Sequence, residues 1–198
     1  MELLSVNAGK VRRATLNGRA FLVAPLSMIV EGVLAGSKGK LHYPGDEISR
    51  STQAWNGMPI TVYHPLMNGL HVSARHPAIA STQQVGTVYN ANTTRLKDGR
   101  RKLKAEGWFD EELTKRVDNR VHDALVNGKQ LEISTGLFTE NTEERGTYNG
   151  RDYDYVARMY VPDHLAILPD QIGACDISAG CGLNVNQQQA AGDPQCPT

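Results

Sequence analysis

Three residues of this chain carry side chains that together could perform nucleophilic chemistry: Ser134, His64 and His164. A serine hydroxyl is a weak nucleophile until a base takes its proton, and imidazole is the side chain best suited to that task near neutral pH. The spacings are 134 − 64 = 70 and 164 − 134 = 30 residues, too long for one helix face. The sequence therefore predicts a site only if three separate strands converge in the folded chain.

Rival assignments exist for each of these roles. A serine within a strand is most often a hydrogen-bonded core residue, and a histidine at a strand end can be a satisfied interior residue. His71 and His76 are alternative bases, although a segment rich in glycine and proline is a poor platform for fixed geometry. Asp163 and Asp170 are alternatives to His164 for orienting the base, because a carboxylate is the commoner third member.

The segments that must position the three candidates have the composition of strands. Residues 60–64 form a β-branched run that ends at the first histidine, and Pro65 should end its pairing. Residues 130–138 form a second strand, which carries the serine, and residues 164–168 form a short buried strand that begins with the last histidine.

Two further strands, residues 85–93 and 102–109, are predicted to form a hairpin through an Asp-Gly turn, since Asp-Gly tolerates positive φ. Alternation in the second strand places Lys102, Lys104 and Glu106 on one face, opposite the apolar residues. This alternation supports the strand assignment.

A helix is predicted over residues 110–126. Asp110 can cap it, apolar residues recur every four positions, and Gly128 ends it. The other expected elements are two strand pieces within 19–35, a short helix within 44–55, a long loop over 66–83, a polar hairpin loop over 141–151 and a strand over 153–160. The pattern predicts a β-rich α+β fold.

Composition excludes several classes of function. Lys+Arg 21 balances Asp+Glu 21, so the charge excess typical of a nucleic-acid-binding protein is missing. No apolar run approaches the roughly 20 residues of a membrane span, and no signal-peptide pattern is present at the N-terminus. We therefore expect a cytosolic protein with neither nucleic acid nor membrane as its main partner.

The C-terminal region contains all three cysteines, Cys175, Cys181 and Cys196. An odd number in a tail is a poor disulfide framework, so we expect reduced thiols and no metal site. Residues 183–198 are too polar to form a core and are predicted to be a flexible linker that follows a domain over residues 1–182.

Three motifs together resemble the phage prohead (head maturation) proteases: WNGMPITVYHP at 55–65, EISTGLF at 132–138 and PDHLAILPDQIGAC at 162–175. The chain looks most like a phage-encoded branch that was long described as a domain of unknown function. The resemblance covers roughly residues 15–182. This family is similar to the herpesvirus assemblins in fold and in its use of Ser and His with a third His or acidic residue.

The resemblance implies a role for each candidate. His64 matches the general base, Ser134 the nucleophile and His164 the third member, and the order and spacings look like those of assemblins. Two departures stand out: Leu137 separates the glycine and the phenylalanine of the family's Ser-x-Gly-Phe signature, and the assemblin arginine pair after the last strand has no counterpart. Backbone N–H groups around residues 172 and 173 (Ile172 and Gly173) are expected to form the oxyanion hole instead.

As implied by the resemblance, the fold is a distorted antiparallel β-barrel with peripheral helices. The activity is that of a serine endopeptidase, without metal or cofactor, that cleaves scaffold and capsid-precursor segments and trims itself. Its expected partners are the scaffold protein and the major capsid protein precursor, its location the host cytoplasm inside the assembling prohead, and homo-oligomers are possible. The main alternative is a catalytically inactive scaffold- or capsid-associated binding domain of the same fold, and a third is a β-rich host binding module.

Overall fold

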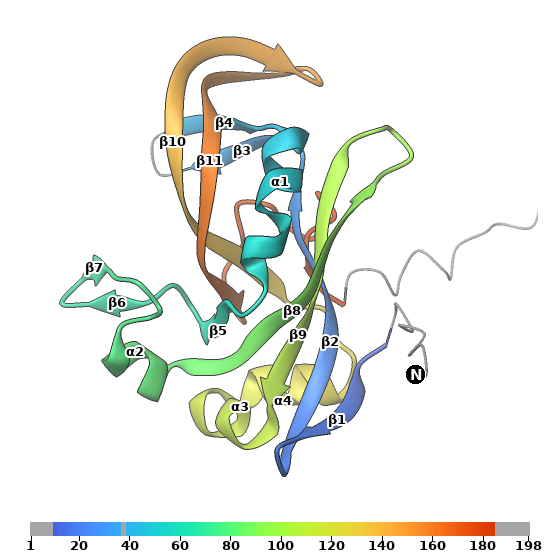
Figure 1. Cartoon of the computed structure of the whole chain (residues 1–198), viewed down its shortest axis with the longest axis vertical. Helices are drawn as coiled ribbons and strands as arrows, with labels where there is room; N and C mark the ends of the chain where they lie inside the picture. The colour runs from blue at the N-terminus through green and yellow to red at the C-terminus, as the bar shows by residue number, and fades with distance from the viewer. Residues whose placement is uncertain (1–9, 37–38, 185–198) are drawn as a thin grey trace, which may run out of the picture.

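A computed structural model of the chain describes residues 10–36 and 39–184 and shows a strand-rich α+β molecule (Figure 1). Ten strands form one sheet, and two short strands form a separate hairpin. The strands of the large sheet are β1 (Arg12–Leu16), β2 (Arg19–Val30), β3 (Gly32–Gly36), β4 (Gly39–Tyr43), β5 (Pro59–Val62), β8 (Gln84–Arg95), β9 (Arg101–Asp110), β10 (Glu132–Tyr148), β11 (Arg151–Leu168) and β12 (Gly182–Leu183).

The order of the large sheet is β1-β2-β9-β8-β5-β11-β4-β3, with β10 paired to β11 and β12 paired to β2. The predicted α+β class is confirmed. The sheet is mixed and not purely antiparallel, because β11 runs parallel to both β4 and β5. Only an isolated bridge between Leu131 and Leu183 links the β10 side to β12, so the described strands form no closed barrel.

The predicted β8–β9 hairpin is confirmed, with antiparallel pairing along both strands. Gly99 lies in the turn at φ 88°, a conformation that glycine adopts without steric cost. On the charged face of β9, Lys102 is only 6% exposed, and Lys104 and Glu106 are partly buried. Residues 178–180 line the same cavity as Lys102, and no pattern in the sequence indicates that long-range cover.

The predicted helix over 110–126 is two helices, α3 (Glu111–Val117) and α4 (Asn119–Val126). Asp110 caps α3 as expected, since its side chain accepts a hydrogen bond from the Leu113 N–H. Asp118 breaks the run: its backbone is extended, and its side chain accepts from the Arg120 N–H and caps α4. A short carboxylate that binds the backbone competes with helix continuation in this way.

The segment predicted as a polar loop over 141–151 is strand instead. β10 continues to Tyr148 and β11 starts at Arg151, so one long hairpin replaces three shorter pieces (Figure 1). The turn residues Asn149 and Gly150 have φ of 49° and 75°, as two-residue hairpin turns require. Cross-strand pairing across register shifts overrides the polar composition of this segment.

The predicted loop over 66–83 contains a small hairpin, β6 (Leu66–Met67) and β7 (Leu70–His71), and a helix, α2 (Pro77–Thr82). Figure 1 shows this hairpin and α2 projecting together beside β5. The predicted short helix in 44–55 is confirmed as α1 (Gly45–Ser51) followed by the 3-10 helix η1 (Thr52–Trp55). Residues 19–35 are the two expected strand pieces, β2 and β3.

The core lies between the sheet and the helices. Ile48 of α1, Trp55 of η1 and Leu125 of α4 are completely buried, and they belong to one apolar cluster with strand residues such as Phe109. Because α1 contacts both β9 and β11, it holds together the two halves of the sheet. The strand that carries the last candidate histidine is therefore fixed by packing on a rigid support.

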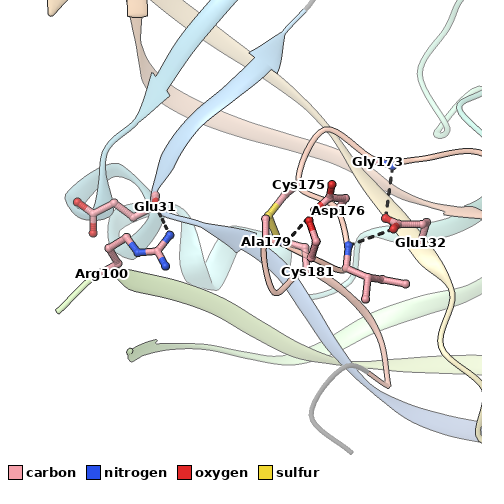
Figure 2. The surroundings of a disulfide bond; sticks show 10 residues. Glu31, Arg100, Glu132, Gly173, Cys175, Asp176, Ala179 and Cys181 are labelled. Carbon is pink, nitrogen blue, oxygen red and sulfur yellow. Dashed lines mark hydrogen bonds between the residues drawn. A yellow bond between two sulfur atoms is a disulfide. The ribbon is translucent and has the colours of Figure 1, made fainter. Parts of the chain in front are cut away.

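The expectation of reduced thiols is wrong for two cysteines, because Cys175 and Cys181 form a disulfide with Cα atoms 5.5 Å apart (Figure 2). The sequence separation is six residues, and both cysteines lie in a buried cluster with Val30. The expected start of the linker at residue 183 is also too early, since Leu183 and Asn184 are buried. The rest of that segment, with Cys196, lies outside the described residues.

Removing the disulfide in a Cys175→Ser/Cys181→Ser double variant should lower the free energy of unfolding by roughly 2 kcal/mol, the loop-closure value for so short a loop. Urea unfolding of oxidised wild type and variant measures this difference. Thiol titration in denaturant should detect two more thiols in the wild type after reduction than before. Equal thiol counts before and after reduction would contradict the assignment.

Candidate active site

His64 follows directly on an unusual backbone turn at the end of β5. Tyr63 has φ of 62°, a left-handed conformation that is rare for a bulky side chain and that tends to persist at functional sites. Its N–H donates to the Ile167 carbonyl at 3.0 Å, and its hydroxyl lies 2.8 Å from the Asp170 carboxylate. These contacts at both ends of Tyr63 fix the direction in which the chain presents His64.

His164 lies on β11 opposite Gly136 of β10. The His164 ring occupies the space above that glycine, and a Cβ atom there would overlap the ring. The imidazole is 7% exposed, so its two nitrogens need partners within the protein. Gly136 is therefore required by the position of the histidine ring.

The two histidine rings form a hydrogen-bonded chain that ends in a carboxylate. His64 Nδ1 lies 2.8 Å from His164 Nε2, and His164 Nδ1 lies 2.8 Å from Asp163 Oδ2. The Ala74 N–H donates to the same carboxylate oxygen at 3.0 Å, and the Ser73 hydroxyl donates to the other oxygen. Asp163 is therefore held by contacts with three groups and is itself only 6% exposed.

The hydrogen bonds from His64 through His164 to Asp163 determine which nitrogen of each ring carries a proton. An ionised carboxylate only accepts hydrogen bonds, so His164 must be protonated on Nδ1 where it faces Asp163. A neutral His164 then has a lone pair on Nε2, which accepts a hydrogen bond from Nδ1 of His64. The remaining nitrogen of His64, Nε2, is left unprotonated and able to act as a base.

The electrostatics favour the neutral form of both rings. Burial, with smaller effects from His164 and His71, lowers the pKa of His64 to about 4. Burial also lowers the pKa of His164, against the opposing effect of Asp163. Burial raises the pKa of Asp163, but hydrogen bonds from Ser73, His164 and the Ala74 N–H outweigh it and hold that pKa below its usual value.

Ser134 lies on β10 two residues before Gly136 and pairs with Ala166 of β11. Residues directly opposite in an antiparallel pair share a face, so Ser134 and His164 are diagonal neighbours on the same face of the sheet. Such neighbours typically have Cβ atoms about 7 Å apart. Among the described residues, Ser134 Oγ makes no hydrogen bond to His64, whose ring partner is His164.

The other predicted site residues have different surroundings. Asp170 binds Tyr63 and Arg120, at 2.8 Å in each case, and neither histidine. The Gly173 N–H points to Glu132 Oε2 at 3.4 Å (Figure 2), so it is directed away from an oxyanion role at Ser134. Ile172 precedes it in the same loop with its side chain 79% exposed.

The rival bases lie outside the hydrogen-bonded chain. His71 is exposed on β7, and its ring approaches His64 edge-on with centroids 6.1 Å apart. His76 caps α2 by accepting a hydrogen bond from the Ala78 N–H at 3.3 Å. Sequence reasoning missed Ser73, which reaches Asp163 only because the segment after β7 folds back onto the C-terminal half of β11. No local pattern marks that contact.

Replacing Gly136 with alanine should reduce any activity that depends on His164 by roughly 10²-fold, the loss that follows when a catalytic ring is displaced by about 1 Å. The added methyl would push directly against the His164 ring. Gly32→Ala is the matched control, because the nearest atom to a methyl group at that position is the Val30 oxygen at 3.9 Å. Initial rates of the two variants, both checked for folding by circular dichroism, measure the effect. Equal rates would contradict it.

Comparison of the chain with protein families, curated proteins and solved structures finds no match. Within residues 10–36 and 39–184, no group of three His, Cys, Asp or Glu side chains is arranged to hold a metal ion. The helices in that part of the chain are all too short or too polar to cross a membrane.

Proposed function

We propose that the protein is a serine endopeptidase in which Ser134 is the nucleophile and His64 the general base. The observation that carries this proposal is the chain from His64 through His164 to Asp163, with both separations 2.8 Å. A partly buried imidazole pair that ends in a buried, hydrogen-bonded carboxylate is costly to build, and it supplies what an activated serine requires. In this mechanism Asp163 is an outer member that acts through His164.

The proposed reaction follows from the protonation pattern. Ser134 Oγ attacks the scissile carbonyl carbon while its proton passes to Nε2 of His64, which gives a tetrahedral oxyanion. His64 then gives that proton to the leaving amine as the C–N bond breaks and an acyl ester forms on Ser134. Water, deprotonated by His64, attacks the ester, and the proton returns to Ser134 as the acid leaves. His164 and Asp163 stabilise the imidazolium in both steps.

The proposed biological setting rests on the three motifs that resemble prohead proteases. The substrates would be extended segments of the scaffold protein and of the major capsid protein precursor, cut within an assembling prohead in the host cytoplasm, and the mixed sheet would be a distorted barrel of the assemblin kind. A catalytically inactive binding domain is the second candidate. Exposed Phe138, Met159 and Val161 on β10 and β11 favour it, since they offer apolar surface for a protein partner.

Covalent labelling with a fluorophosphonate tests the proposed activity and its pH dependence. Labelling of Ser134 requires neutral His64, whose pKa is lowered to about 4, so the rate should hold between pH 7 and pH 5 and fall only near pH 4. A histidine with an ordinary pKa would halve the rate near pH 6.5. Intact mass and peptide mapping measure the label at each pH, with circular dichroism as the check on folding.

The Ser134→Ala variant is the control for this labelling and should remain unmodified. Labelling at another serine, or none at any pH in folded protein, would favour the binding-domain candidate over the protease. If the labelling rate instead fell near pH 6.5, the protease assignment would stand, but the lowered pKa of His64 would be contradicted.

A further inference from the structure

Lys102 of β9 is the least expected charged residue of the structure. It is 6% exposed, yet within residues 10–36 and 39–184 its ammonium group has no hydrogen-bond or ion-pair partner. Its Nζ lies close to the Gly180 backbone, 3.7 Å from where a Cβ atom would stand. An ammonium group largely withdrawn from bulk water is poorly solvated, so a negative group placed beside it would be favourable.

The ammonium group faces a cavity of about 390 Å³ lined by three further cations, Arg95, Arg100 and Lys104. Residues 178–180 form the opposite wall. Among the described residues Arg95 donates only to the Gly99 carbonyl, whereas Arg100 is paired with Asp98 at 2.7 Å. Of the described residues that line this cavity, none is acidic. Its lining thus has an excess of positive charge in a chain whose net charge is zero.

The wall opposite the cations is held in place by covalent and polar links. The disulfide between Cys175 and Cys181 closes the loop that contains residues 178–180 (Figure 2). Within that loop the Asp176 carboxylate accepts from the Ser178 hydroxyl and the Ala179 N–H, both at 2.7 Å. The loop's one acidic side chain is therefore occupied by groups of the loop itself, and it does not neutralise the lysine.

The charge state of Lys102 agrees with this geometry. Burial, with a smaller effect from Lys104, lowers the pKa of Lys102 to about 8. The ammonium is still largely protonated at pH 7, but its solvation is poor, so an anion in the cavity would gain a strong, charge-assisted interaction.

We propose that this cavity is a binding site for a small, multiply charged oxyanion of the phosphate class, with Lys102 as its central contact and Arg95, Arg100 and Lys104 around it. The site lies between the β8–β9 hairpin and the disulfide loop and shares no residue with the His64–His164–Asp163 chain. The proposal is therefore independent of the protease activity. Free phosphate, pyrophosphate and the phosphate groups of a nucleotide share this chemistry.

Isothermal titration calorimetry of the full, oxidised chain tests the proposal with inorganic phosphate, pyrophosphate and ATP as separate probes. Pyrophosphate should bind to the wild type, and Lys102→Met should weaken that binding at least tenfold, roughly the value of one buried charged hydrogen bond. Lys115→Met is the matched control: Lys115 is half-exposed on α3, where it approaches Glu111 at 3.8 Å, and its loss should leave binding unchanged. Tighter binding of ATP than of pyrophosphate would identify a nucleotide as the source of the phosphate.

Folding of the Lys102→Met variant is checked by its thermal transition, which should stay or rise because a poorly solvated charge has been replaced by an apolar side chain. Arg95→Gln is the second variant; Arg95 is exposed, so its replacement leaves the core intact, and it should weaken pyrophosphate binding severalfold. The proposal is overturned if none of the three probes binds to the wild type at millimolar concentration, or if Lys102→Met and Arg95→Gln bind pyrophosphate as the wild type does.

Discussion

Cleavage of a co-expressed scaffold or capsid precursor should disappear when Ser134 is replaced by alanine. Under the proposed mechanism the hydroxyl is the only group that forms a bond to the substrate, and removal of such a nucleophile costs on the order of 10⁶-fold in rate. The fold should be unaffected, because Ser134 is half-buried on β10 and its oxygen anchors no other described side chain. Gel analysis of the co-expressed precursor and intact mass of its products measure the loss.

Ser81→Ala is the control for this experiment. Ser81 lies on the exposed side of α2, and among the described residues it bonds only to the Ala78 carbonyl of its own helix, so its loss should leave processing at the wild-type rate. Wild-type processing by Ser134→Ala would remove the nucleophile assignment, whatever the state of the histidine pair.

Local chemistry explains the parts of the fold that sequence reasoning predicted. Asp110 caps α3 through contacts with its own neighbours, and the Asp-Gly turn of the β8–β9 hairpin depends only on the φ that glycine allows. The apolar runs that end at His64 and begin at His164 are strands because their residue types suit a sheet.

The errors arose where distant segments or backbone-binding side chains decide the outcome. Asp118 stands in a helix-compatible pattern, yet its carboxylate binds the Arg120 N–H and divides the helix. Lys102 alternates with apolar residues along β9, yet it is buried and lines a cavity with residues 178–180, which are distant in the sequence. Cys175 and Cys181 become partners only because that loop folds back on β2, which no spacing rule specifies.

In the candidate site, too, local sequence predicted some residues, and long-range contacts determined others. Its three residues were selected by type and strand position, and the structure places His64 and His164 in contact at 2.8 Å. The sequence offered Asp163 as a substitute for His164, whereas in the structure it is the next link of the same chain. Ser73 could not be selected at all, because its role follows from the return of the segment after β7 to Asp163.

Replacing His64 with alanine should reduce the rate of precursor cleavage by roughly 10²–10⁴-fold, the usual contribution of a general base. Its unprotonated Nε2 is the group that would take the serine proton. Among the described residues, no other ring forms a hydrogen bond to His164. His164→Ala should cost less than Ser134→Ala and retain measurable turnover, because His164 acts only by orienting and stabilising His64.

The two rival histidines provide matched controls. His71→Ala should keep nearly the wild-type rate, since its exposed ring only meets His64 edge-on. His76→Ala should lower stability by about 1 kcal/mol through loss of the α2 cap while leaving the rate intact. Initial rates with a peptide from the processed precursor site, together with urea unfolding, separate the two effects. A drop in cleavage rate for His71→Ala equal to that for His64→Ala would assign the base to the β6–β7 hairpin. The hydrogen bonds from His64 through His164 to Asp163 would then be structural.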